Sequence, residues 1–118
     1  MRKFKDLTIW KRSFELVNQV YNICDELPKD EKFGLISQIR RCAVSIPSNI
    51  AEGAGRRTDK EFGRYLEIAI SSSFELETQL LIAQKRKMLK DDSTQTILDE
   101  LNQIQKMIYA FYSRLKPF

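Results

Sequence analysis

The side chains of this chain that could do chemistry are few, and histidine is missing from them. Without a histidine, the sequence excludes di-iron bundles built on Glu-x-x-His motifs, zinc sites with His ligands and a His general base. Cys24 and Cys42 are the two cysteines. They are too few to close a structural zinc site. They could pair with each other, but each sits on or beside an apolar helical stripe, where a free cysteine behaves as a small buried hydrophobe. We therefore expect no metal and no cofactor.

The remaining candidates for catalysis are four carboxylates and a glycine turn. The carboxylates are those of Glu52, Glu67, Glu75 and Glu77. Two of them, Glu75 and Glu77, are two residues apart on a helix and so point to different faces. A solvated helix face, or an ion pair with an arginine of the preceding helix, accounts for them. The turn at 53–57 reads GAGRR and lacks the strand, the lysine and the Ser/Thr of a phosphate-binding loop. We therefore expect no catalytic residues and no enzyme.

The elements that hold these residues are helices, because apolar residues recur at spacings of three and four and nowhere alternate with period two. With 118 residues, four glycines and three prolines, the composition fits one helical domain over 1–118. We predict helices over about 7–27, 31–52, 59–88 and 93–116. The expected core stripes are Trp10, Phe14, Val17, Tyr21 and Cys24 in the first helix; Ile36, Ile39, Ala43, Ile46 and Ile50 in the second; Phe62, Leu66, Ala69, Ser73, Leu76, Leu80 and Ala83 in the third; and Ile97, Leu101, Ile104, Ile108, Phe111 and Leu115 in the fourth.

Residues between the stripes indicate where the helices begin and end. Asp6 is an expected N-cap of the first helix, and an acidic first turn at 30–31 suits the dipole of the second. Gly53 and Gly55 are expected to end the second helix at positive φ. Thr58 and Glu61 form a capping box before the third helix. Short connections make consecutive helices antiparallel neighbours, so the predicted fold is an all-α, up-down-up-down four-helix bundle.

Pro47 lies inside the apolar stripe of the second predicted helix. A proline there removes one N–H group, clashes with the carbonyl of Ala43 and disfavours helical dihedrals at Ile46. Either the helix continues through a kink, or it breaks and Asn49 and Glu52 cap a new short helix. The stripe keeps its register across the proline, which favours a kinked, continuous helix. Three successive serines at 71–73 on the third helix are expected to allow close packing of a neighbouring helix.

Positive charge is unevenly distributed along the expected bundle. The end that holds the N-terminus, the 53–57 turn and the C-terminus collects eleven cations against four anions, a net charge of +7, whereas the opposite end carries six of each sign. Such polarity is typical of a phosphate-binding surface. The residues expected to bind nucleic acid, RNA or DNA, are Arg2, Lys3, Lys5, Lys11, Arg12, Arg56, Arg57, Lys60 and Arg64. The alternative is a protein-interaction scaffold or accessory subunit that docks an acidic partner through this end without direct nucleic-acid binding.

Two further apolar lines indicate self-association. The third helix carries Ile70, Phe74 and Leu81 beside its core stripe, and the first carries Ile9, Leu16 and Ile23 at heptad spacing. Because a monomeric bundle has no use for both lines, we expect them to meet between subunits of a homo-oligomer. No membrane partner is expected: the N-terminus lacks the apolar core of a signal peptide and no apolar run approaches ~18 residues, so the protein is expected to be soluble and cytoplasmic.

The run around Pro47 resembles a known family. Residues 38–56 read QIRRCAVSIPSNIAEGAGR, 58–69 read TDKEFGRYLEIA and 75–80 read ELETQL. This pattern, and above all SIPSNIAEG between Arg41 and Arg56, resembles the 23S ribosomal RNA intervening-sequence proteins over nearly the whole chain. The resemblance implies a four-helix bundle that assembles as a homopentamer, has no known enzymatic activity and is connected with nucleic acid. It also extends to accessory proteins of diversity-generating retroelements, which work with a reverse transcriptase and its RNA, so a reverse transcriptase or another protein is an expected partner.

Overall fold

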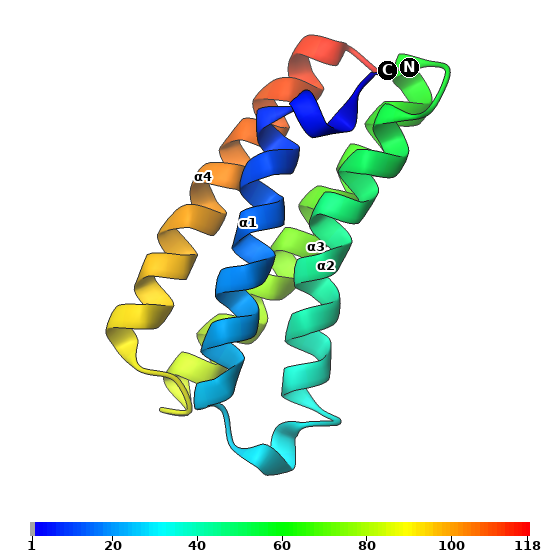
Figure 1. Cartoon of the computed structure of the whole chain (residues 1–118). Helices are drawn as coiled ribbons and strands as arrows, with labels where there is room; N and C mark the ends of the chain where they lie inside the picture. Colours follow the sequence, from blue (N-terminus) through cyan, green and yellow to red (C-terminus); the bar gives the residue numbers. More distant parts are fainter. Residues whose placement is uncertain (1) are drawn as a thin grey trace.

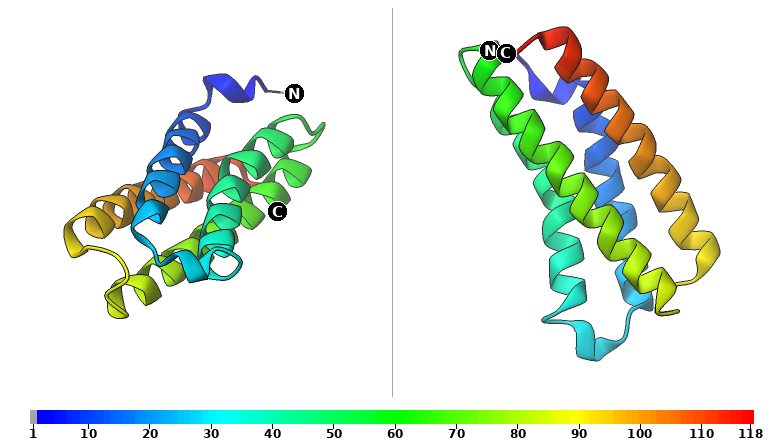
Figure 2. Two further views of the ribbon diagram at one scale, coloured as in Figure 1. Left: turned by 60° about the horizontal axis from the view of Figure 1, so that its bottom comes forward. Right: turned by 180° about the vertical axis from the view of Figure 1, so that it is seen from behind.

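Four α-helices make up most of the computed structural model, which describes residues 2–118 (Figure 1). They are α1 (Thr8–Ile23), α2 (Leu35–Ala54), α3 (Asp59–Lys85) and α4 (Asp91–Leu115), with short 3-10 turns at Phe4–Asp6, Cys24–Glu26 and Lys29–Glu31. The described residues contain no strand. Each helix packs on its neighbours in the order α1, α2, α3, α4 and back to α1, and the two views of Figure 2 show that they run alternately up and down. The predicted all-α four-helix bundle is confirmed.

The core is formed by the stripes predicted for α2, α3 and α4. Every stripe residue of α2 and α3 is buried. In α4 the stripe is buried as far as Ile108, and Phe111 and Leu115 are half-buried against the core. Ser73 is fully buried, and its hydroxyl donates to the carbonyl of Ile70 at 2.6 Å, so this polar group is satisfied within its own helix.

The core face predicted for the first helix is wrong except at Cys24, which is buried. Phe14 is 56% exposed and Tyr21 41% exposed, while Trp10 and Val17 are only half-buried. The buried side of α1 is instead the neighbouring stripe, made of Ile9, Ser13, Leu16, Val20 and Ile23. The two stripes are offset by one residue, and Ser13 interrupts the buried one. The Ser13 hydroxyl donates to the carbonyl of Trp10 at 3.1 Å, so a serine is accommodated in the core and the aliphatic stripe can pack there.

The first two helices begin differently from the prediction. Asp6 caps nothing: Leu7 occupies the N-cap position of α1 and no side chain caps the helix. Helix α2 begins at Leu35, four residues later than predicted, because 29–31 forms a 3-10 turn and Gly34 adopts a non-helical conformation. An acidic side chain still stabilises the start of α2, because the Glu31 carboxylate accepts a hydrogen bond from the Leu35 N–H at 3.2 Å.

Helix α3 begins and ends with recognisable caps. The Thr58 hydroxyl accepts from the Glu61 N–H at 3.1 Å and donates to the Glu61 carboxylate at 3.2 Å, which confirms the cap predicted there. At the other end Lys87 takes a left-handed φ of 59°. The Met88 N–H donates to the Ala83 carbonyl and the Lys87 N–H to the Gln84 carbonyl. This is a Schellman motif, with a lysine at the position that glycine usually occupies.

The glycines at the end of α2 act differently from the prediction. No glycine of the described chain has a positive φ: Gly53 is helical, and Gly55 follows the helix at φ −83°. A Cβ on Gly53 would lie 2.7 Å from Cδ1 of Phe62 and 2.7 Å from Cβ of Tyr65. Gly53 is therefore required by the close approach of α3 to α2 and not by its own backbone conformation.

Helix α2 runs unbroken through Pro47, so the prediction of a continuous helix is confirmed and the alternative of a break is wrong. Asn49 does not cap a second helix, because its side-chain amide donates to the Ser45 carbonyl at 2.8 Å and to the Ser45 hydroxyl at 2.9 Å. The Ser45 hydroxyl in turn lies 2.8 Å from that of Ser72 on α3. This small polar cluster ties α2 to α3 at the level of the proline.

Candidate nucleic-acid interface and apolar groove

Both chain ends and the α2–α3 turn meet at one end of the bundle, called here the basal end (Figures 1 and 2). The N-terminal segment is attached there by a hydrogen bond from the Arg2 N–H to the Ala54 carbonyl at 2.9 Å. Six of the nine cations predicted to bind nucleic acid are exposed at this end and form no ion pair within residues 2–118: Lys3, Lys5, Lys11, Arg57, Lys60 and Arg64. Their ammonium and guanidinium groups are free to contact anions.

Arg2 and Arg56 lie in the same region but already have partners. Arg2 pairs with Asp59 at 3.2 Å, and its guanidinium lies over the ring of Phe62, 5.3 Å from the centroid. The Arg56 guanidinium donates to the Tyr65 hydroxyl at 2.5 Å and lies 4.8 Å from that ring's centroid. It also approaches the Glu52 carboxylate at 3.7 Å. These contacts stiffen the turn and the N-terminal segment, and they leave part of each guanidinium exposed.

Arg12 belongs to the structure of the bundle and not to its basic surface. It forms a two-point ion pair with Glu100 of α4, with N–O distances of 3.0 and 2.5 Å, and a further contact of 3.1 Å to the sulfur of Met107. Both charged partners are only about one-third exposed. A bidentate pair of this kind fixes α1 against α4 and occupies the donors that a phosphate would need. The expectation that Arg12 binds nucleic acid is therefore not supported by its position.

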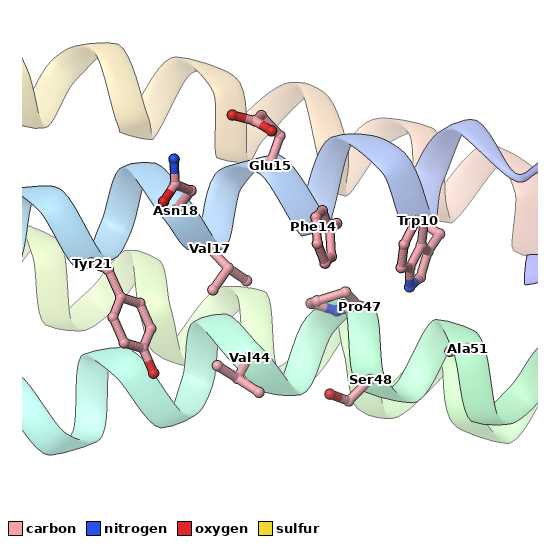
Figure 3. A pocket seen from close by; sticks show the side chains of 10 residues that line it. All are labelled: Trp10, Phe14, Glu15, Val17, Asn18, Tyr21, Val44, Pro47, Ser48 and Ala51. Carbon is pink, nitrogen blue, oxygen red and sulfur yellow. The ribbon is translucent and has the colours of Figure 1, made fainter. Parts of the chain in front are cut away.

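An apolar groove runs along the outside of the molecule between α1 and α2 (Figure 3). It contains the aromatic stripe of α1 that was expected in the core. Its main lining residues are Trp10, Phe14, Val17 and Tyr21 from α1, and Val44, Pro47, Ser48 and Ala51 from α2. Both sets recur at spacings of three and four, which is the pattern that accepts a third helix. Pro47 faces Phe14 across the groove.

The expected oligomer interface is wrong in its first-helix part. Ile9, Leu16 and Ile23 are 4%, 1% and 4% exposed and form part of the bundle core, so they cannot meet another subunit without unfolding α1. The third-helix part does lie on the surface: Phe74 is 54% and Leu81 45% exposed, and Ile70 is half-buried. Ile68 and Ile82 of α3 are also exposed, at 47% and 48%. The groove could have been predicted from the sequence, because α1 has two parallel apolar stripes and only one of them can face the core. The aromatic stripe is the one that faces outward.

The cysteines and the candidate carboxylates are held by contacts within the bundle. Both thiols are free. Burial raises the pKa of the Cys24 and Cys42 thiols, and the Glu75 carboxylate, 3.6 Å from the Cys42 sulfur, raises that of Cys42 further. Glu67 and Glu77 accept hydrogen bonds from two different α4 side chains. Throughout residues 2–118 no three potential ligands lie close enough to hold a metal ion.

Comparison with known proteins places the chain in a family. The sequence profile of the 23S rRNA-intervening sequence proteins matches residues 5–110. The chain belongs to the 23S rRNA-intervening sequence protein family.

A solved relative has the same fold as this family member. It is a protein of unknown function from the S23 ribosomal protein family of Bacteroides thetaiotaomicron VPI-5482, whose crystal structure superimposes with a TM-score of 0.83 at 23% sequence identity. The superposition covers 89% of this chain and 98% of that one. Among curated proteins none matches the chain. Within residues 2–118 of this intervening-sequence protein, no helix is both long enough and apolar enough to cross a membrane.

Proposed function

We propose that this intervening-sequence protein is a non-enzymatic, oligomeric bundle that binds nucleic acid, RNA or DNA, through its basal end. The observation that carries the proposal is a group of six exposed cations at that end that form no ion pair among residues 2–118. They come from three separate segments: Lys3, Lys5 and Lys11; Arg57; Lys60 and Arg64. Cations that are already solvated and unpaired contact phosphates at little cost and release condensed counterions, which drives binding. The family's description in terms of 23S rRNA supports the same class of ligand.

The position of the cations favours contact with the backbone of the nucleic acid over reading of its bases. Arg57 lies in the turn before α3, and Lys60 and Arg64 occupy the first two turns of that helix. Long, exposed side chains contact phosphates and position the ligand, but they do not reach base edges in a defined geometry. Sequence tolerance and strong dependence on salt follow from this arrangement.

The absence of catalysis is part of the proposal and is supported by the environments of the carboxylates and thiols. Glu67, Glu75 and Glu77 each accept a hydrogen bond from a different residue. No pair of them converges on a cavity, as a general acid and base would.

Self-association is proposed to use the groove between α1 and α2 and an exposed face of α3, called here the α3 ridge. The ridge consists of exposed apolar residues of α3, namely Ile68, Phe74, Leu81 and Ile82. A groove on one face and a ridge on another give a head-to-tail contact, and we propose that the rotation between neighbouring subunits closes it into a ring. The number five comes from the family resemblance alone.

Charge complementarity supports this pairing. Hydrogen bonds from Cys42 to Glu75 and between Ser45 and Ser72 show which residues of α2 and α3 lie at the same height. If the bundles of the ring stand parallel to one another, Glu75, midway along the ridge, would therefore lie level with Arg41 of the next subunit. Arg41 lies one turn from Val44, on the rim of the groove, is exposed and forms no ion pair within residues 2–118.

The oligomer is tested by light scattering after size-exclusion chromatography. Phe74→Asp on the ridge and Phe14→Asp in the groove are both exposed substitutions, so each should leave the helical fold intact and lower the mass to that of one chain. Ala110→Asp, at an exposed apolar residue of α4 on the side opposite to Gln105 and Tyr112, which contact α3, is the matched control and should leave the assembly unchanged. A wild-type monomer at micromolar concentration would contradict this part of the proposal.

Nucleic-acid binding is tested by fluorescence anisotropy with a structured RNA at several salt concentrations. Arg57→Glu with Lys60→Glu should weaken binding and lower the slope of log K against log salt by roughly 0.7 to 0.9 per lost contact. The control, Lys85→Glu with Arg86→Glu at the opposite end, makes the same change in net charge and should have much less effect. Equal losses from the two variants would mean that only net charge matters.

The second candidate function is a protein scaffold that docks an acidic partner, a reverse transcriptase or another protein, through the same cations. The anisotropy titration with RNA at several salt concentrations also distinguishes these two candidate functions. A scaffold should show no RNA binding at ~50 mM salt, where exposed charges still interact strongly.

A further inference from the structure

Three aromatic side chains form a row beside the basic surface, called here the aromatic strip: Tyr109, Tyr112 and Phe118. The rings of Tyr109 and Tyr112 are stacked at 26° with centroids 6.5 Å apart. The ring of Phe118 follows at 6.4 Å from that of Tyr112. Tyr109 is 64% and Phe118 90% exposed. Exposed aromatic rings in a row are costly in a soluble protein unless a ligand covers them.

The fold holds this strip in place. Lys116 takes a left-handed φ of 50° and turns the chain back after α4. The buried Pro117 then packs onto Gly63 of α3 so closely that a Cβ at that glycine would lie 2.3 Å from Cβ of the proline. Tyr112 is fixed from the other side, because its hydroxyl donates to the Glu67 carboxylate at 3.1 Å. Phe118 is thus positioned by its neighbour, and the row of rings is organised before any ligand arrives.

Positive charge surrounds the strip. Lys60 lies one helical turn before Gly63, and Lys106 one turn before Tyr109, while Lys116 is part of the turn itself. All three are exposed and form no ion pair among residues 2–118. Glu67 brings a carboxylate to the strip, and this group already accepts a hydrogen bond from the Tyr112 hydroxyl. The surface therefore combines π faces with flanking cations, as surfaces that bind single-stranded nucleic acid do.

We propose that the aromatic strip binds unpaired bases, so that the ligand of the basal end is single-stranded RNA or DNA, or the unpaired part of a folded one. The inference depends on the proposed function, because Lys60 and the neighbouring cations supply the phosphate contacts. Bases stack on Tyr109 and Phe118, whose faces are the more exposed, and Tyr112 keeps the two rings in line. Bases inside a duplex are already stacked on each other and cannot use the strip.

The test compares two probes of equal length, a fluorescein-labelled oligouridylate and a double-stranded RNA, by fluorescence anisotropy. The wild type should bind the single strand more tightly than the duplex. Tyr109→Ala with Phe118→Ala should weaken binding of the single strand by at least about 10-fold, from two lost stacking contacts, and leave duplex binding unchanged. Tyr109→Phe with Phe118→Tyr keeps both π faces and should retain single-strand affinity.

Phe33→Ala is the matched control, because Phe33 is also 90% exposed and lies 5.5 Å from a lysine ammonium, that of Lys32, but at the opposite end of the molecule. Phe33→Ala should leave the affinities for the single-stranded and the double-stranded probe unchanged. If the double alanine variant binds the single strand as tightly as the wild type, while Arg57→Glu with Lys60→Glu weakens both probes, the inference fails and the proposed function stands. If the wild type binds neither probe, both fail.

Discussion

Gly53→Ala is the substitution whose effect the structure defines best. The new methyl group would lie 2.7 Å from Cδ1 of Phe62 and 2.7 Å from Cβ of Tyr65, about 1 Å inside the usual carbon–carbon separation. Phe62 cannot move away easily, because it is 1% exposed and packs on the ring of Phe111 with centroids 5.4 Å apart. The methyl group would therefore push α2 and α3 apart at the start of the turn that carries the cations.

The magnitude follows from two opposing effects. Overpacking of this severity costs about 3 kcal/mol, and alanine regains about 1 kcal/mol of helix propensity over glycine. The net loss of unfolding free energy is about 2 kcal/mol, which lowers the melting temperature of a domain of this size by roughly 8 °C. Thermal and urea unfolding followed by circular dichroism measure it, at equal protein concentrations because association shifts both midpoints.

Gly55→Ala is the control, two residues away in the same turn. Its methyl group would meet only the Glu52 carbonyl at 3.5 Å and the Ala51 carbonyl at 3.9 Å, and its backbone φ of −83° suits any residue. Loss of unfolded-state entropy should then stabilise the protein by about 0.4–1 kcal/mol. If Gly53→Ala were as stable as the wild type, or if both variants shifted alike, the argument from close helix approach would be refuted.

Three further predictions concern residues outside the basic surface. Pro47→Ala restores a helix N–H but removes the ring that faces Phe14 in the groove, so thermal stability should be kept or raised while light scattering shows weaker assembly; a clear stability loss with intact assembly would contradict this. Arg12→Leu should cost about 1–2 kcal/mol in a urea melt by leaving the partly buried carboxylate of Glu100 unpaired, with RNA affinity in anisotropy unchanged. Because burial raises its pKa, the Cys42 thiol should react with iodoacetamide more slowly than a free cysteine at pH 8, and the rate should keep rising above pH 9; a rate equal to that of free cysteine would refute the burial argument.

The sequence predicts the bundle because α2 and α4 each have one main apolar line, and in α3 the second line is much shorter than the core stripe. In α1 the same rule fails, since aliphatic and aromatic stripes run side by side and periodicity cannot say which one faces inward. The packing of the other helices decides which stripe is buried, and it leaves Phe14 and Tyr21 exposed on the surface. The same limit explains why Ile9 and Leu16 were expected at an interface between subunits.

Side-chain partners were harder to predict than helices. Charge counting places Arg12 with the other cations of the basal end, but its pairing with Glu100 depends on which turn of α4 lies beside α1. The role of Gly53 also depends on a neighbour, Phe62, that is nine residues away along the chain. The pairing of Arg12 and the requirement for Gly53 both depend on contacts between helices. The spacing of residues within one helix carries no information about such contacts.

The central claim, that nucleic acid binds the basal end, is tested most directly on the wild-type protein by lysine footprinting. Brief acetylation with and without excess single-stranded RNA, read by mass spectrometry, reports the accessibility of each ammonium group separately. Binding through the basal end predicts protection of Lys3, Lys5 and Lys60, with unchanged labelling of Lys29 and Lys90 at the opposite end. Uniform labelling of all five lysines, or protection at the opposite end, would contradict it.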